Sequence, residues 1–119
     1  MVLVDTSVWV SHFRRGEEAL KALLEEGKVA RHPYIIGELA CGKMANWTEI
    51  LGLLRALPQA PVAEHEEVLR FLEISRLMGV GLGYVDVHLL ASARLTGILF
   101  WTKDARLREA AVGLGVSFR

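Results

Sequence analysis

Short apolar runs alternate with amphipathic segments along this chain, and this alternation restricts the folds that the chain can adopt. Val2-Leu3-Val4 is a continuous apolar run of the kind that forms a buried strand in a parallel sheet. Ile98-Leu99-Phe100-Trp101 is the clearest run of this kind in the second half of the chain. An alternating order of strands and helices predicts an α/β fold with helices on both sides of a mainly parallel sheet. The candidate strands cover residues 2–4, 29–30, 61–63, 98–101 and 116–118, so we expect about four to five strands.

The helical segments are indicated by apolar spacing and by residues that begin or end helices. Val68, Phe71 and Leu72 recur at helical spacing, Pro33 suits the first position of a helix, and Gly97 is a typical helix end. The predicted helices cover residues 7–13, 17–26, 34–44, 47–57, 64–78, 84–96 and 104–111.

Composition limits the class of protein further. The 119 residues fit one domain, residues 1–119, and the hydrophobic content of 52% supports a proper core. The 14 basic and 14 acidic residues cancel, so the strongly basic footprint of a nucleic-acid binder is absent. A phosphate substrate stays possible, because a bound metal ion would supply positive charge locally. With Cys41 as the single cysteine, and no signal peptide or membrane span evident, we expect a cytoplasmic protein without a membrane partner.

Four acidic residues lie where apolar runs meet predicted helices: Asp5, Glu38, Asp86 and Asp104. Because parallel strands end at one edge of a sheet, these carboxylates are candidates to converge there. Converging carboxylates repel one another, and a divalent cation is the usual remedy. Oxygen ligands favour Mg²⁺ or Mn²⁺, and the histidines show no zinc-like spacing with Cys41.

Each acid also has a structural explanation that the sequence leaves open. Asp5 and Asp104 are suited to capping the helices that follow them, and Glu38 could lie on the solvent face of its helix. Asp86 shares a face with apolar residues three, four and seven positions on, although it could also cap its helix. His88 is predicted to be a surface residue or a polar residue with its hydrogen bonds satisfied.

The four acids occur in segments that resemble a known family. The segments are Val2-Leu3-Val4-Asp5-Thr6-Ser7-Val8-Trp9, His32-Pro33-Tyr34-Ile35-Ile36-Gly37-Glu38-Leu39, Gly83-Tyr84-Val85-Asp86-Val87-His88-Leu89-Leu90-Ala91-Ser92-Ala93 and Trp101-Thr102-Lys103-Asp104. In this order they resemble the PIN-domain nucleases, and among them the VapC-type toxins of bacterial and archaeal toxin–antitoxin pairs. One departure is Leu90, where many members carry alanine, and it concerns packing rather than chemistry.

The resemblance implies a three-layer α/β/α sandwich and the hydrolysis of RNA phosphodiester bonds by a metal-dependent endoribonuclease. It implies that the four acids hold one or two Mg²⁺ or Mn²⁺ ions. Thr6 and Thr102 would support them by hydrogen bonding to the carboxylates or the substrate. It also implies a homodimer and a cognate antitoxin, which in this family often inserts an arginine into the acidic pocket.

An RNA substrate needs positive charge near the acidic site. Lys103 and Arg106 lie nearest to the expected site and are the candidates for contacting RNA. Trp9, Phe13 and Trp47 are predicted to be core or subunit-interface residues rather than platforms for base stacking.

Two other classes of function compete with this interpretation. A PIN-like module without catalysis would be signalled by the loss of acids, and all four are present. A magnesium-dependent phosphatase of the haloacid dehalogenase type needs a second aspartate at position 7, which is Ser7 here. A phosphotransfer receiver domain needs an acidic pair near the first strand, and Val2-Leu3-Val4-Asp5 supplies a single acid.

Overall fold

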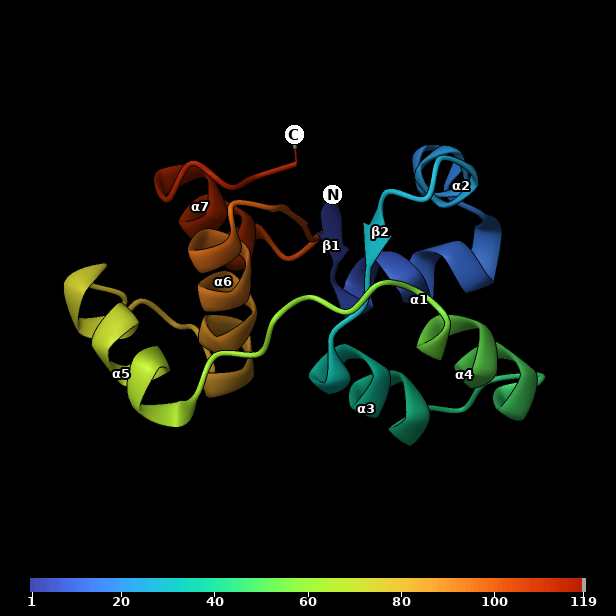
Figure 1. Cartoon of the computed structure of the whole chain (residues 1–119), viewed down its shortest axis with the longest axis horizontal. Coiled ribbons are helices and arrows are strands. Elements are labelled where there is room, and N and C mark those ends of the chain that lie inside the picture. Colours follow the sequence, from blue (N-terminus) through green and yellow to red (C-terminus); the bar gives the residue numbers. More distant parts are fainter. Residues whose placement is uncertain (119) are drawn as a thin grey trace.

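The computed structural model describes residues 1–118, and within this range strands and helices alternate along the chain (Figure 1). The strands are β1 (Val2–Val4), β2 (Val29–Ala30) and β3 (Leu99–Trp101). The helices are α1 (Thr6–Arg15), α2 (Glu18–Glu25), α3 (Pro33–Cys41), α4 (Trp47–Arg55), α5 (His65–Ile74), α6 (Tyr84–Thr96) and α7 (Ala105–Gly113).

The three strands form a parallel sheet in the order β2-β1-β3. Val2 lies opposite Val29 on one side and Leu99 on the other, so β1 is the central strand. Helices α5, α6 and α7 lie to one side of the strands and α1 to α4 to the other (Figure 1). The predicted α/β class, a parallel sheet flanked by helices, is therefore confirmed.

The sheet has fewer strands than the four to five expected. Within the described range, residues 61–63 form no strand, and pairing is limited to a single bridge between Arg31 and Gln59. Pro58 and Pro61 flank that bridge, and a proline has no backbone N–H to donate to a ladder. Residues 116–118 likewise make one bridge, between Phe100 and Ser117, instead of a strand.

Several helices differ in length from the prediction. Helix α5 ends at Ile74 rather than at residue 78, because Arg76 adopts a left-handed conformation with φ of 53°. Helix α3 ends at Cys41 rather than at residue 44, because the next residue, Gly42, adopts an extended conformation. Apolar residues continue at helical spacing past both helix ends, so this spacing could not predict where the two helices end.

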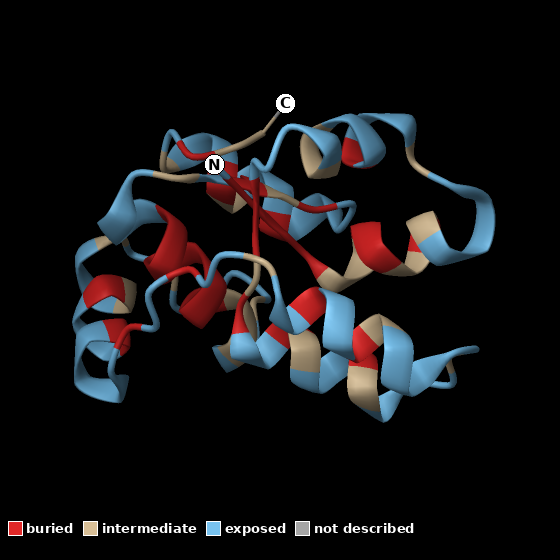
Figure 2. Cartoon of the chain, turned by 45° about the vertical axis from the view of Figure 1, so that its right-hand side comes forward, coloured by how far each residue is buried: buried red, intermediate tan, exposed pale blue. Residues whose placement is uncertain are grey.

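The core surrounds β1 and the middle of α6. All three residues of β1 are buried, as expected for a central strand covered on both faces. Residues 87–93 of α6 are buried without interruption, because this helix packs between β3 and α5 (Figure 2). Within residues 1–118, no helix combines the length and the apolar character needed to cross a membrane.

Candidate functional site

Asp5 is a buried carboxylate at the carboxyl end of β1. Its side chain is only 7% exposed, and its Oδ2 accepts hydrogen bonds from Ser7 Oγ at 2.7 Å and Thr102 Oγ1 at 2.8 Å. Hydrogen bonds to an ionised group are stronger than neutral ones, and they offset the cost of removing the charge from water. Within the described residues both bonds fall on Oδ2, so Oδ1 remains available to a ligand.

Thr102 and Ser7 join the end of β3 to the first turn of α1. Their hydroxyl oxygens lie 3.3 Å apart, and Ser7 Oγ accepts a bond from the backbone N–H of Lys103 at 3.0 Å. Thr102 Oγ1 accepts a bond from the backbone N–H of Asp104 at 3.1 Å. Thr102 therefore bonds to the Asp5 carboxylate, and its supporting role in a site stays a prediction. Ser7 bonds to the same oxygen, and the sequence interpretation did not name it among the supporting residues. Its position two residues after a strand-end acid was the available signal.

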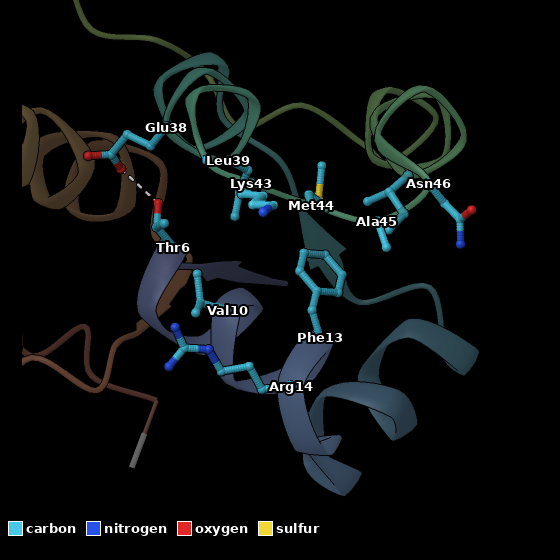
Figure 3. Close-up of a pocket in the computed structure, with 12 residues that line it drawn as sticks. Thr6, Val10, Phe13, Arg14, Glu38, Leu39, Lys43, Met44, Ala45 and Asn46 are labelled. Atoms are coloured by element: carbon cyan, nitrogen blue, oxygen red, sulfur yellow. Dashed lines mark hydrogen bonds between the residues drawn. The ribbon is translucent and has the colours of Figure 1, made fainter.

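Glu38 reaches the same edge from helix α3. Its Oε1 accepts a hydrogen bond from Thr6 Oγ1 at 2.7 Å, drawn as the dashed line in Figure 3. Because Thr6 directly follows Asp5 in the chain, this bond ties helix α3 to the residue after the buried carboxylate. Glu38 is exposed to solvent, so it lies on the surface of its helix while it bonds to Thr6. Its role in a metal site stays a prediction.

Asp86 and Asp104 are both engaged in capping helices. Asp86 Oδ2 accepts the backbone N–H of Gly83 at 3.0 Å, at the start of α6. Asp104 is the N-cap of α7, and its Oδ1 accepts the backbone N–H of Leu107 at 2.9 Å. The structural explanations for these two acids are therefore present in the molecule, and they leave one oxygen of each carboxylate without a capping bond.

Hydrogen bonds join some of the predicted site residues and not others. Asp5, Thr102 and the backbone of Asp104 form one network, Thr6 holds Glu38 beside it, and no hydrogen bond in residues 1–118 joins Asp86 to them. Within the same range, no three His, Cys, Asp or Glu side chains lie close enough to hold a metal ion. The donors themselves are carboxylate and hydroxyl oxygens, which is the chemistry that fits Mg²⁺ or Mn²⁺.

The two predicted RNA-contacting residues contact different parts of the chain. Lys103 Nζ pairs with Glu17 at 2.9 Å, which directs it toward α2. The pKa of Glu17 is lowered by its hydrogen bonds from Ser11 and then from Lys103. Arg106 is exposed and covers Gly81, where an added Cβ would lie 2.5 Å from its Nη1. Arg106 thus lies against the loop that leads to Asp86.

A groove of about 430 Å³ begins at Thr6 and Glu38 and runs between α1 and the segment from α3 to α4 (Figure 3). Phe13 lines it and is 39% exposed, and Trp47 on α4 is 44% exposed. Of the three aromatic residues predicted to be core or interface, only Trp9 belongs to the core, at 4% exposure. The other two present apolar surface to solvent.

Two buried histidines lie between the helices that carry Glu38 and Asp86. His32 caps α3 by accepting the backbone N–H of Tyr34 on Nδ1, and its ring centroid lies 6.2 Å from that of His88. Burial lowers the pKa of His32 to about 4, with a further contribution from His88. Burial also lowers the pKa of His88. The prediction for His88 was wrong, since it is 2% exposed and its Nδ1 has no partner within residues 1–118.

A parallel sheet flanked by helices, with an acid at the end of its central strand, is an arrangement that PIN domains share with other α/β proteins. The PIN domain family model matches residues 2–113, so this chain belongs to the PIN domain family. The chain is 45% identical over 118 residues to Ribonuclease VapC32 of Mycobacterium tuberculosis, in strains CDC 1551 / Oshkosh and H37Rv. The alignment covers 98% of this chain and 95% of the relative.

A solved structure supports the fold independently. The crystal structure of PAE2754 from Pyrobaculum aerophilum superposes with a TM-score of 0.62 at 18% sequence identity. The superposition covers 94% of this chain and 80% of that one. At this identity the likeness concerns the fold alone.

Proposed function

We propose that this chain is a metal-dependent endoribonuclease that hydrolyses RNA phosphodiester bonds as the toxin of a toxin–antitoxin pair. The observation that carries the proposal is the buried Asp5 of a PIN domain, held through one oxygen by Ser7 and Thr102. The near full-length similarity to a protein named as a VapC ribonuclease supports the substrate class.

We assign the metal site to Asp5, Glu38 and Asp86, with Asp104 as the fourth acid. The cation is Mg²⁺ or Mn²⁺, and when bound it would promote deprotonation of water and offset charge on the phosphate. Thr102 and Ser7 fix the Asp5 carboxylate, and Thr6 keeps Glu38 at the same edge. We assign Arg106 to offset phosphate charge beside the acids. Lys103 would contact RNA only after leaving its ion pair with Glu17.

The direct test is an RNA cleavage assay with Mg²⁺, Mn²⁺ or EDTA on the wild type and on Asp5→Asn and Asp86→Asn. We expect EDTA to abolish cleavage and each substitution to reduce it by about 100-fold or more, because an amide keeps the shape and removes the charge. Glu73→Gln removes an exposed acid of α5 and is the matched control. Equal cleavage by the wild type and both site variants would refute the metal site.

Asp104 needs a variant that separates its two roles. Serine is as good a helix cap as aspartate, so Asp104→Ser keeps the bond to the N–H of Leu107 and removes the charge. We expect unchanged thermal stability and a cleavage rate at least about tenfold lower, if Asp104 acts in the site. A rate equal to that of the wild type would leave Asp104 as a helix cap only.

We assign two protein partners to the chain, a cognate antitoxin and a second copy of itself. The groove of Figure 3 is the surface that we assign to the antitoxin, because it places apolar side chains beside the acidic Glu38. Suppression of RNA cleavage by the co-expressed product of a neighbouring antitoxin gene would test the first partner. The mass of the chain in solution would test the second.

A PIN-like interaction module without catalysis is the second candidate function. The observation in its favour is that no three potential metal ligands lie close together within residues 1–118. The same assay separates the two candidates, since a non-catalytic module would cleave no RNA with either metal.

A further inference from the structure

A hollow of about 440 Å³ opens beside the acidic edge, on the flank formed by β3, α2 and α7. Its lining residues are Ala19, Trp101, Thr102, Lys103, Arg108 and Phe118. Thr102 belongs both to this hollow and to the Asp5 network, through its 2.8 Å bond to Asp5 Oδ2. The hollow therefore adjoins the proposed catalytic carboxylate, and its volume lies within the range of about 300–1,000 Å³ typical of small-ligand sites.

Two aromatic rings form one wall of this hollow. Trp101 and Phe118 have ring centroids 5.1 Å apart and planes inclined at 47°, and both side chains are partly exposed. Side chains alternate along a strand, so Phe100 and Thr102 are buried while Trp101 faces the other way. A partly exposed tryptophan beside an acidic site is a surface on which a nucleobase can stack.

The cations of the hollow complement this aromatic wall. Arg108 is exposed, and its guanidinium has no ion pair or hydrogen bond within residues 1–118. Lys103 is balanced by Glu17, so Arg108 supplies the uncompensated charge. A guanidinium binds phosphate through paired N–H donors, and an aromatic ring binds the base, so together they match the two ends of a nucleotide.

We propose that this hollow binds a nucleotide of single-stranded RNA that flanks the bond to be cleaved. The base stacks on Trp101 and Phe118, and the phosphate pairs with Arg108. Stacking tolerates any base, so the subsite contributes affinity and a preference for unpaired RNA rather than a sequence code. This inference rests on the proposed ribonuclease function and adds a substrate subsite to it.

The experiment measures binding of a short fluorescently labelled single-stranded RNA to full-length chain carrying Asp5→Asn, which prevents cleavage. On this background we compare Trp101→Leu with Trp101→Phe, and Arg108→Gln with Arg108→Lys. We expect Trp101→Leu to raise Kd about tenfold, since stacking of one base is worth roughly that factor, and Trp101→Phe to raise it much less. Arg108→Gln should raise Kd and make Kd less dependent on salt concentration. Arg108→Lys should keep most of the affinity and most of the salt dependence.

Tryptophan fluorescence supplies a second readout. Bound RNA should quench the emission of Trp101, and Trp47→Phe, a substitution on exposed α4, should leave that quenching in place. With the active Asp5, Trp101→Leu should raise KM far more than it lowers kcat. Because Arg108 is exposed, its variants report on the subsite even if Trp101→Leu folds poorly.

The outcomes separate this inference from the proposed function. Metal-dependent cleavage with equal Kd for all four variants would overturn the subsite and leave the nuclease intact. RNA binding that depends on Trp101 and Arg108 in a chain that cleaves nothing would support the subsite and overturn the catalytic proposal. An equal loss of affinity in Trp101→Leu and Trp101→Phe would also contradict stacking, because phenylalanine retains a ring.

Discussion

Two side chains hold the carboxylate of Asp5 in place, and neither of them is itself charged. Ser7 and Thr102 each donate to Oδ2, and Thr102 in turn accepts from the backbone of Asp104. A buried carboxylate with one oxygen satisfied and the other available is suited to hold a cation, because its rotamer is fixed before anything binds. The residue scale is therefore where the site can be tested most directly.

Thr102→Val should weaken both the fold and the site. Valine has the shape of threonine without its hydroxyl, so Asp5 loses one of its two hydrogen bonds. A hydrogen bond to a charged group is worth about 1.5–3 kcal/mol, and we expect a loss of unfolding free energy of that size in urea denaturation. The loss should shrink when Asp5→Asn is already present. An equal loss on both backgrounds would contradict the coupling between Thr102 and Asp5.

The lowered pKa of buried His32 makes the free energy of unfolding depend on pH. Its pKa is about 4 in the folded chain and near the ordinary value of 6.5 when unfolded, so between these values the unfolded state binds more protons. Stability contributed by neutral His32 is thus complete above pH 6.5 and is lost as pH falls toward 4. The total is about 3 kcal/mol.

Urea denaturation at several pH values between 4 and 7 measures this slope. His32→Asn keeps an acceptor for the N–H of Tyr34 and does not titrate, so the pH dependence should flatten by the amount that His32 contributes. His65→Asn changes an exposed histidine and serves as the control. A wild-type slope that persists in His32→Asn would show that other groups are responsible.

At the scale of elements, the end of α6 sets the start of β3. Gly97 adopts φ of 71° and ψ of 23°, and its N–H bonds back to the carbonyl of Ala93. This left-handed cap lets the chain reverse and enter Leu99 within two residues, which places Thr102 at the sheet edge. The position of Thr102, a predicted site residue, therefore depends on one backbone conformation.

A pair of glycine substitutions tests this dependence. Gly97→Ala meets no atom within 4 Å, so its cost is conformational, about 1–2 kcal/mol for a left-handed alanine. Gly52→Ala also meets no atom, but it lies within helix α4 with negative φ and should stabilise the chain by about 0.5–1 kcal/mol. Thermal melting measures both changes. Changes of the same sign would contradict this account of Gly97.

At the scale of the whole molecule, local signals in the sequence predicted β1, α6 and the α/β class well. Val2-Leu3-Val4 is apolar throughout because it is central, and α6 begins and ends at glycines. The predictions of strands at residues 61–63 and 116–118 were wrong, because strand pairing depends on partners that lie far away in the chain. Asp5 and Thr102 are 97 positions apart, so no local pattern could show that they bond.

The same limit applied to polar residues. The buried pair His32 and His88 is unremarkable in the sequence, and only packing reveals what surrounds these two rings. Asp86 illustrates the opposite case, since its capping bond to Gly83 was foreseeable from its place in the first turn. The sequence predicted the four candidate acids, while the hydrogen bonds that each acid makes were visible only in the folded chain.

The four acids come from separate elements, so a cation that they share should stabilise the whole molecule. A ligand at 100 times its Kd adds about 2.7 kcal/mol to the free energy of unfolding, which corresponds to a Tm increase on the order of 10 °C for a chain of this size. We expect millimolar Mn²⁺ to raise the Tm of the wild type and of Glu73→Gln, and EDTA to reverse the rise. Asp5→Asn should abolish the rise in Tm, because it removes the fixed carboxylate that binds the ion first. Glu38 and Asp86 would then have to reorient toward that ion. An equal rise in Asp5→Asn would place the bound ion elsewhere, and no rise in the wild type would argue against a shared cation.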